Sequence, residues 1–354
     1  MPSRSCYSRF SFNSHRLSMK LSRFFQRPTR SAPSNADRMP SAVPVATAIR
    51  GSDPILPPLL LDNRLRAEMT VKCRDCDAIP KVPDAGKVVQ IDGIAAQIMH
   101  NGVLVVAGGY YGEWMTDIIT RLQGHHEPQE ELVFHEVLKH VPPRATMLEL
   151  GGFWSYYSLW FKSQHGDTRR SYVVEPDPGN IGVGRSNAAL NGYEITFVQG
   201  CVGADDKVAT NFKTESSGEI SVPQISIPTF LRDHGLSHLD VLHCDTQGAE
   251  TEIIRSCEGL FRSGAIRFAI FATHSHHISG DPLTHQRCLA MLEQFGGTIL
   301  AEHDVHESFS GDGLIAVHFG AQPIAWAAPS LSRNRYSTSL FRNPLYDLAE
   351  NINS

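Results

Sequence analysis

Residues 147–158 read Met-Leu-Glu-Leu-Gly-Gly-Phe-Trp-Ser-Tyr-Tyr-Ser, and this stretch decides the fold. An apolar run that carries Glu149 leads into the Gly151-Gly152 pair, and an aromatic segment able to start a helix follows. A strand, a glycine turn and a helix N-terminus in this order usually receive a nucleotide-type cofactor. Ser155 stands where a third glycine is usual. The stretch therefore predicts a cofactor loop that includes Glu149, Gly151, Gly152 and Ser155.

Strand-like and helix-like segments alternate from residue 145 onward, with short connections between them. The Asn191-Gly192 pair after residues 178–190 is typical of a left-handed helix C-cap. Such alternation indicates a mostly parallel sheet with helices on both faces. The expected strands are 145–150, 171–175, 195–198, 207–213, 224–227, 239–244, 267–273, 297–302 and 313–319, and the expected helices are 155–165, 178–190, 228–234, 249–260 and 282–295.

The last two strands, 297–302 and 313–319, have no full helix between them. We therefore expect an α/β fold with a doubly wound, mostly parallel seven-stranded sheet whose last strand is antiparallel, as in class I methyltransferases. The strand-like runs 88–97 and 102–107 indicate a small N-terminal β-containing subdomain or lid. The expected divisions are a tail at 1–55, this subdomain at 56–130, a core domain at 131–320 and a polar extension at 321–354.

The charge of the 354-residue chain is unevenly distributed. Residues 1–50 hold nine Lys/Arg and one acid, a formal charge of +8, so the remainder carries −13 for a total of −5. An acidic body binds nucleic-acid phosphates poorly, so we expect no nucleic-acid partner. No segment approaches the roughly 18 consecutive apolar residues that cross a bilayer, and we expect a cytoplasmic protein without membrane insertion. The Ser-, Arg- and Pro-rich start is a targeting segment, a disordered tail, or an over-extension that precedes a true start at Met39.

Seven cysteines are scattered along the chain, and Cys73-Arg-Asp-Cys76 is the pair with a suggestive spacing. A zinc site would need two more ligands at a compatible spacing, and the sequence has no second Cys-x-x-Cys. We favour a structural turn for this pair over a metal or redox role.

Polar residues follow the strands at the ends where such a sheet binds ligands. Glu175 lies about 25 residues after the glycine turn, a spacing that suits hydrogen bonds from ribose hydroxyls. Asp177 and Asp245 are ordinary helix N-caps when taken singly, but the whole series favours a ligand site. The series is Glu149-Leu-Gly151-Gly152, Glu175-Pro-Asp177-Pro, Asp245-Thr-Gln-Gly-Ala-Glu250 and Thr273-His-Ser-His-His277.

These motifs resemble the FkbM family of S-adenosylmethionine-dependent methyltransferases over about residues 125–320. The family pattern Asp-x-Gly-Ala-Asn-x-Gly-x-Tyr-Ser falls on Glu149, Gly151, Gly152, Phe153, Ser155, Tyr157 and Ser158. The family element Glu-Pro-x-Pro falls on Glu175 to Pro178, and the element Asn-x-x-x-Asn-Gly falls on Asn187 to Gly192. The element Lys-x-Asp-x-Glu-Gly-x-Glu falls on His243, Asp245, Gln247, Gly248 and Glu250. The resemblance implies a methyltransferase domain at 131–320 and S-adenosylmethionine as the cofactor. The loop residues Glu149, Gly151, Gly152 and Ser155, together with Glu175 and Asp177, are then expected to bind it.

Four positions depart from the family pattern. Phe153 replaces Asn and Ser155 replaces Gly in the cofactor loop, while His243 replaces Lys and Gln247 replaces Glu beyond it. Ser155 is small enough to let a cofactor approach the backbone, so we expect cofactor binding to be retained. His243 and Gln247 change any charge-based role of their positions, and a cofactor-binding protein without transferase activity stays an alternative.

Methyl transfer from a sulfonium needs positioning, exclusion of water and often a base for an acceptor hydroxyl. Histidine suits the role of base because its ordinary pKa lies near neutrality. Alternation along an extended segment would place His274 and His276 on one face, so we expect one of them to be the base, with Asp245 orienting it or the acceptor. Two other interpretations stay open: a divalent metal held by Asp245, His274 and His276, and loop histidines held by hydrogen bonds.

Two segments before the core have two interpretations each. The family often carries Glu-Pro where this chain has Glu127-Pro128, so Glu127 is expected to close over the cofactor. The alternative is a helix start with acids in its first turn. The aromatic run 110–114 either covers an acceptor or forms an ordinary packing turn.

The expected function is methyl transfer from S-adenosylmethionine, as O-methylation of a hydroxyl on a small molecule or glycan with a histidine base. One alternative is a nicotinamide-dependent Rossmann oxidoreductase, against which the incomplete Gly-x-Gly-x-x-Gly stands. The other is a non-catalytic cofactor-binding protein of a biosynthetic assembly. The sequence leaves the acceptor and the oligomeric state open.

Overall fold

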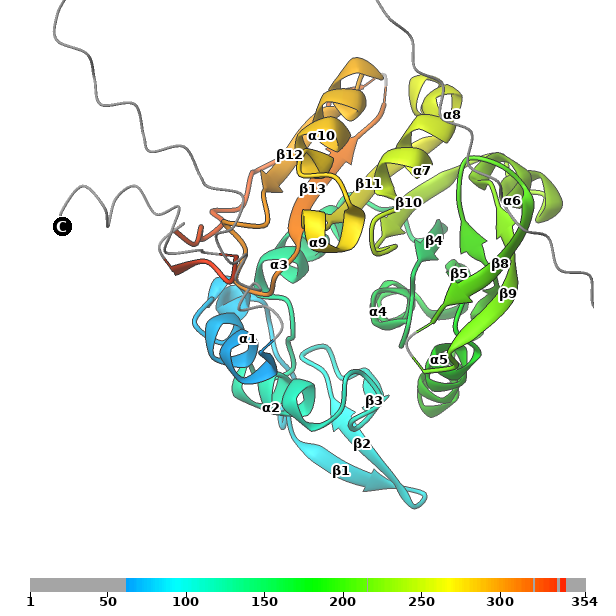
Figure 1. Ribbon diagram of the computed structural model, residues 1–354. Helices are drawn as coiled ribbons and strands as arrows, with labels where there is room; N and C mark the ends of the chain where they lie inside the picture. The colour runs from blue at the N-terminus through cyan, green and yellow to red at the C-terminus, as the bar shows by residue number, and fades with distance from the viewer. Residues whose placement is uncertain (1–61, 215, 321, 336–337, 342–354) are drawn as a thin grey trace, which may run out of the picture. The chain divides into compact units, whose positions relative to one another are not determined.

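The structure is a computed structural model that describes residues 62–214, 216–320, 322–335 and 338–341. The expected tail at 1–55, with Met39, lies outside the described residues. A seven-stranded sheet has the order β12-β13-β11-β10-β4-β5-β6 (Figure 1). Its strands are β4 (Thr146–Leu150), β5 (Arg170–Glu175), β6 (Thr196–Gln199), β10 (Leu239–Cys244), β11 (Ile266–Thr273), β12 (Thr298–His303) and β13 (Gly313–His318).

The pairing of these strands confirms the predicted fold. Strands β6, β5, β4, β10 and β11 are parallel, and β13 lies antiparallel between β11 and β12. Chain order reverses between the neighbours β4 and β10, and in open α/β sheets this reversal point is where ligands bind.

Both faces of the sheet are covered because strand residues alternate between two apolar clusters. Met147 and Phe268 pack in one cluster, while their neighbours Leu148 and Ala269 pack in the other. Residues of β4 and β10 are buried at every position, as expected for strands covered on both faces. The first cluster includes residues of α2 (Glu113–Arg121), α3 (Pro128–Leu138) and α4 (Tyr156–Ser163), and the second includes residues of α6 (Ile227–Asp233), α7 (Glu250–Ser256), α8 (Glu258–Arg262) and α10 (Thr284–Gln294).

The N-terminal part contains the predicted β structure in a different arrangement. The run 88–97 is a hairpin, because Asp92 and Gly93 both have positive φ and turn the chain. A three-stranded antiparallel sheet results, in the order β1 (Val88–Ile91), β2 (Ile94–Ile98) and β3 (Leu104–Val106). The helix α1 (Asn63–Thr70) and the short 3-10 helix η2 (Asp75–Ala78) precede it.

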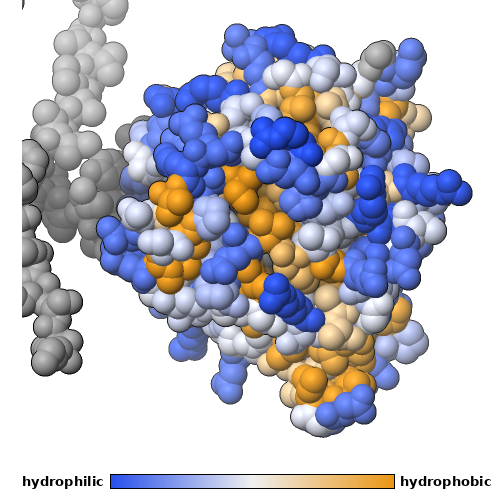
Figure 2. Space-filling model, turned by 90° about the vertical axis from the view of Figure 1, so that its right-hand side faces the viewer, coloured by the Kyte–Doolittle hydropathy of each residue, from blue (hydrophilic) through white to orange (hydrophobic). Residues whose placement is uncertain are grey.

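A second small sheet, in the order β7-β9-β8, is inserted between β6 and α6. It contains β7 (Cys201–Val202), β8 (Lys207–Lys213) and β9 (Glu219–Ile225), so the second predicted strand begins earlier than expected. Figure 2 looks onto the side that carries β8 and β9 in Figure 1, where hydrophobic patches are separated by hydrophilic side chains.

The predicted helix 249–260 is two helices. The Cys257 N–H is shared between the carbonyls of Ile253 and Ile254, so the last turn of α7 tightens there and α8 begins at the next residue. The 3-10 helix η3 (Gly166–Thr168) follows α4. In the described part of the chain, every helix is too short or too polar to cross a bilayer.

Two asparagines of α5 (Pro178–Asn191) hold the edge strand β3, and we call them the asparagine clamp (Asn187 and Asn191). The Asn187 carboxamide accepts a hydrogen bond from the Val106 N–H at 2.7 Å and donates one to the Trp154 carbonyl at 3.0 Å. Asn191 accepts from the Leu104 N–H at 2.9 Å and donates to the Leu104 carbonyl at 2.7 Å. The clamp thus provides hydrogen bonds that a neighbouring strand would otherwise make.

Replacement of Asn187 by Ala leaves the half-buried Val106 N–H and the buried Trp154 carbonyl without their partner. We expect the free energy of unfolding to fall by about 2–4 kcal/mol in urea denaturation. The matched control is Ser186→Ala on the exposed side of the same helix, with an expected change within about 0.5 kcal/mol. Equal stability of the two variants would contradict the role given to the clamp.

Candidate active site

A cavity of about 590 Å³ opens at the carboxyl ends of β4, β5 and β10. Its size lies in the range of small-molecule and cofactor sites. Its wall includes Gly151 and Gly152 from the loop after β4, Glu175 at the end of β5 and Asp245 after β10. The predicted loop and these two strand ends therefore meet at the reversal point of the sheet.

Steric constraint shapes the glycine loop. Gly151 has φ +70°, and a Cβ atom there would overlap the carbonyl oxygen of Asp245. Ser155 also has a left-handed backbone, with φ 63°, which explains why glycine is usual at its position. A Cβ on Gly184 of α5 would lie 2.6 Å from the Ser155 hydroxyl, so the glycine at 184 makes room for the serine.

The carboxylates near the loop organise its backbone. Glu149 accepts a hydrogen bond from the Ser158 N–H at 3.0 Å, and burial raises the pKa of this carboxyl. Glu175 accepts from the N–H groups of Phe153 and Asp177 at 3.1 and 2.9 Å. It thereby links the cofactor loop to the start of α5.

Asp177 is the N-cap of α5 and also holds the turn after β8. It accepts from the Gly179 N–H at 2.8 Å and from the backbone and hydroxyl groups of Ser216 and Ser217. Burial works against its charge, but these hydrogen bonds outweigh it and lower the pKa of Asp177. Its side chain lines the cavity while it is bound to this turn.

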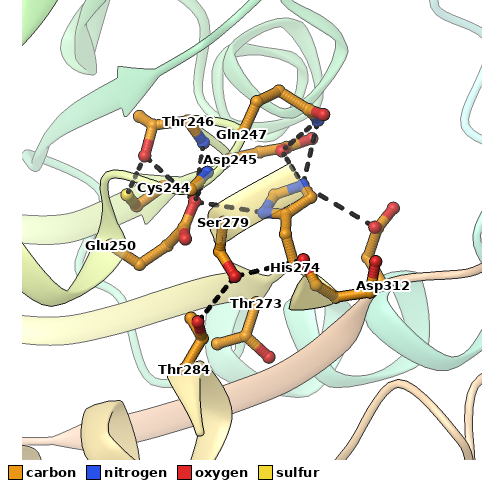
Figure 3. Close-up of polar contacts among 12 residues, drawn as sticks. Cys244, Asp245, Thr246, Gln247, Glu250, Thr273, His274, Ser279, Thr284 and Asp312 are labelled. Carbon is orange, nitrogen blue, oxygen red and sulfur yellow. Dashed lines mark hydrogen bonds and ion pairs between the residues drawn. The ribbon is translucent and has the colours of Figure 1, made fainter. Parts of the chain in front are cut away.

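Asp245, which lines the cavity, belongs to one charged network with His274 (Figure 3). The His274 Nε2 atom is 3.1 Å from Asp245 and 3.6 Å from Asp312, and its Nδ1 atom is 3.1 Å from Glu250. Burial disfavours the imidazolium, but Asp312, Asp245 and Glu250 outweigh it and hold the pKa of His274 well above its ordinary value. His274 is therefore charged at neutral pH.

His276 does not join this network. The strand β11 ends at Thr273, and His276 begins the short helix α9 (His276–Ser279), where its side chain is exposed and its ring contacts His277. The expectation of an extended segment that carries His274 and His276 on one face is therefore wrong, because helix replaces strand there. The structure brings Asp245 and His274 together and leaves His276 outside.

His243 and Glu130 are the site residues that sequence reasoning missed. The His243 Nε2 atom lies 2.6 Å from Glu130, and both side chains are buried. His243 lines the cavity, and its ring stacks on Tyr157 with 4.1 Å between ring centroids. The replacement of the family lysine by His243 was a signal, but its partner is 113 residues away in sequence. Glu130 gave no signal beyond an acid in the first turn of a helix.

Glu127 lies directly before α3 and lines the cavity. It accepts a hydrogen bond from the Tyr157 hydroxyl at 3.1 Å and lies 3.4 Å from His126 Nε2. Burial opposes ionisation, but His126 outweighs it and lowers the pKa of Glu127. Glu127 thus stands at the start of a helix and also faces the cavity. Its contact with a cofactor stays a prediction. Tyr110 and Tyr111 line the same cavity.

His100, His125 and Glu131 form a buried group within metal-binding distance of one another. The two imidazole rings are stacked, 4.2 Å apart and 16° from parallel. An imidazole binds a metal in its own plane, and two nearly parallel planes share no such point. Glu131 lies 2.5 Å from His125 Nδ1 and 2.6 Å from His126 Nδ1, so we assign the group to buried hydrogen bonding.

Cys73 and Cys76 are buried thiols. Burial raises the pKa of Cys73 to about 12 and raises that of Cys76 further. Protonated, buried thiols agree with the structural turn favoured for this pair.

The cavity fits S-adenosylmethionine by charge as well as by volume. The glycine loop leaves backbone free of Cβ atoms, and the wall is rich in carboxylates, which suit a cofactor with a cationic sulfur. Lys213 is the lysine on this wall within the described residues. The carboxylates of the described wall are Glu127, Glu149, Glu175, Asp177, Asp245 and Glu252.

The overlap at Gly151 can be separated from the cost of positive φ alone. Gly166 also has positive φ, +55°, but a Cβ there meets no atom within 4 Å. We expect Gly166→Ala to lower the free energy of unfolding by about 1 kcal/mol and Gly151→Ala by about 3 kcal/mol or more, measured by urea denaturation. An equal loss of unfolding free energy in the two variants would contradict the overlap at Gly151, because it would show that a side chain fits between the ends of β4 and β10.

His274→Gln tests the charged network through pH. Because the pKa of His274 is higher in the folded protein, protonated His274 adds to the free energy of unfolding. This contribution is complete at pH values below the ordinary pKa of about 6.5, and it is lost as the pH rises through the folded-state pKa. We therefore expect the variant to lose about 3–5 kcal/mol at slightly acidic pH and less at alkaline pH, measured by urea denaturation across pH. The exposed His277→Gln is the control, and a loss independent of pH would contradict the assignment.

Comparison with known proteins agrees with the resemblance seen in the sequence. The model of the methyltransferase FkbM domain matches residues 136–298. A comparison with curated proteins found no match.

Solved structures of methyltransferases also match the chain. The methyltransferase FkbM from Methylobacillus flagellatus KT is 13% identical, with 50% of this chain and 44% of that chain covered and a TM-score of 0.38. Precorrin-6y C5,15-methyltransferase from Geobacter metallireducens GS-15 is 14% identical, with 54% and 88% covered and a TM-score of 0.36. TrmK of M. capricolum in complex with S-adenosyl-homocysteine is 10% identical, with 55% and 71% covered and a TM-score of 0.35. This chain thus spans less than half the length of the first of them. Residues 136–298 of this chain are thus similar to the methyltransferase FkbM domain.

Proposed function

We propose that this protein transfers the methyl group of S-adenosylmethionine to a hydroxyl on a small molecule or a glycan, with a histidine as base. The observation that carries the proposal is the cavity at the reversal point of the sheet. Its wall holds the glycine loop, Glu175, Asp245 and His243.

Glu175 and the loop support the cofactor end of this proposal. A carboxylate at the end of the second strand of such a sheet suits ribose hydroxyls. Glu175 is 5% exposed and is held in place by the Phe153 and Asp177 N–H groups. When bound, S-adenosylmethionine supplies a methyl group on a cationic sulfur that an oxygen can displace in line.

Aromatic and charged side chains support the acceptor end. The rings of Tyr110, Phe153 and Tyr157 line the cavity, where they can shield a bound acceptor from water. Asp245 is held by His274 and faces the same cavity, where it can accept a hydrogen bond from an acceptor hydroxyl. His126 and His243 are cavity-wall histidines, so the base is sought there and not at His276.

Calorimetry with the full chain tests the proposal against its alternatives. We expect binding of S-adenosylmethionine and S-adenosylhomocysteine and none of NAD. Glu175→Gln is expected to weaken the affinity for S-adenosylhomocysteine by about tenfold or more, because a charge-assisted hydrogen bond contributes about 1.5–3 kcal/mol. The control is Glu194→Gln, an exposed acid that does not line the cavity.

The outcomes separate the candidate functions. Binding of NAD without either sulfur cofactor would favour an oxidoreductase and contradict the proposal. Cofactor binding with no turnover of any hydroxyl compound would favour the non-catalytic alternative.

A further inference from the structure

We infer that His243 is the base that deprotonates the acceptor hydroxyl. Glu130 is the positioning residue that keeps the ring proton of neutral His243 on Nε2. This inference rests on the proposed function. It assigns the base to a histidine and carboxylate pair, which we call the Glu130–His243 pair, at the position where the family pattern has lysine.

The pair is fixed on three sides. His243 is 2% exposed and lies opposite Glu149 in the register of β10 and β4. Its Nε2 atom lies at hydrogen-bond distance, 2.6 Å, from Glu130 of α3. Its ring stacks on Tyr157 of α4, with the planes 30° apart. A base held in this way loses little entropy when an acceptor binds.

The second ring nitrogen decides what the pair can do. Among the described residues, His243 Nδ1 has no hydrogen-bond partner, and it is shielded from bulk water. A proton on Nδ1 would be a buried donor without an acceptor, whereas a bare Nδ1 beside a cavity can accept the proton of a hydroxyl. The tautomer with the proton on Nε2, bonded to Glu130, is therefore the reactive one.

The other histidines near the site place both ring nitrogens close to carboxylates, although His126 Nδ1 makes no hydrogen bond among the described residues. His126 has Nδ1 at 2.6 Å from Glu131 and Nε2 at 3.4 Å from Glu127. Burial disfavours its charge, but these two carboxylates outweigh it and raise the pKa of His126 to about 10. His274 likewise faces carboxylates with both nitrogens. Both are imidazolium ions at neutral pH and have no lone pair to offer.

Four groups face His243 from the elements packed against it. They are Glu130 of α3, Glu149 of β4, Tyr157 of α4 and Asp245 after β10. Burial lowers the pKa of His243, but the three carboxylates outweigh it and raise the pKa above its ordinary value. The positive charge of a bound cofactor works in the opposite direction, because like charges disfavour protonation. A bound cofactor therefore favours the neutral form of His243, which can accept a proton.

The transfer step balances with these groups. The acceptor O–H bond breaks, its proton goes to His243 Nδ1, and the oxygen electron pair forms the new bond to the methyl carbon. The electron pair of the broken carbon–sulfur bond stays on sulfur, which becomes neutral. Glu130 neutralises the imidazolium until the proton leaves to water.

Nitrogen NMR of histidine-labelled full chain tests the assignment without an acceptor. The signals of His243 are identified by their loss in His243→Gln. We expect the neutral ring to carry its proton on Nε2, both free and with S-adenosylhomocysteine. Glu130→Gln is expected to lower the pKa of His243 by about 1–3 pH units, the effect of a close opposite charge. The matched control is Glu136→Gln on the same helix, whose partner is the surface Lys139.

Calorimetry in buffers of different ionisation enthalpy adds a second readout. S-adenosylmethionine binding is expected to release more protons than S-adenosylhomocysteine binding, and His243→Gln is expected to remove the difference. A neutral His243 with its proton on Nδ1, or a pKa that Glu130→Gln leaves unchanged, overturns the inference. Failure of the wild-type chain to bind either cofactor overturns the proposed function instead, because the tautomer is also measured in the free protein.

Discussion

The backbone of Gly151 lies against the carbonyl group of Asp245, and the active-site cavity depends on this contact. Strands β4 and β10 are neighbours, and the Asp245 N–H donates to the Leu150 carbonyl at 2.9 Å just before the chains separate. With no side chain at Gly151, the loop after β4 and the turn after β10 stay close at the reversal of strand order. The glycine loop and Asp245 therefore reach one cavity from two strands.

The electrostatics of the site follow from burying many acids together. A carboxylate shielded from water needs a nearby positive charge or several hydrogen-bond donors. This chain meets the need mainly with histidine: His126 lies between Glu127 and Glu131, and His274 lies among Asp245, Glu250 and Asp312. These imidazolium ions fix the direction of the carboxylates that face the cavity. His243 differs because only its Nε2 atom contacts a carboxylate in the described structure, while its Nδ1 atom has no hydrogen-bond partner there.

Much of the fold could be predicted because strand and helix periods in the core are regular. Strands such as β10 are continuous apolar runs, and the Asn191-Gly192 pair ends α5 with Gly192 at φ 65° as expected. The cofactor loop could be predicted for the same reason, since strand, glycines and helix are adjacent in sequence. The hairpin at Asp92-Gly93 and the break between α7 and α8 at Cys257 were missed, because the hydrophobic pattern continues across both points. The backbone conformation of one or two residues ends the strand or the helix there.

The charged groups around His243 and His274 could not be predicted from the sequence, because they depend on contacts between distant segments. Glu130 meets His243 only after α3 packs on the sheet, and Asp312 meets His274 only after β13 inserts beside β11. Pattern reasoning singled out the histidine-rich segment at 274–277 by its density of histidines. The fold divides that segment at Ser275: the buried His274 side chain precedes it, and the exposed helix α9 follows it.

The asparagine clamp also limits how the active site can open. Asn187 and Asn191 tie β3 to α5, and Asp177 at the other end of that helix ties the turn after β8. Swinging the N-terminal sheet away as a rigid body would break the bonds to Leu104 and Val106 together, each worth about 0.5–1.5 kcal/mol. The loop 107–112 follows β3, and its Gly108 and Gly112 both have positive φ. Separation of β3 from α5 would therefore cost all of these hydrogen bonds together, so the clamp favours one fixed position of the N-terminal sheet against α5.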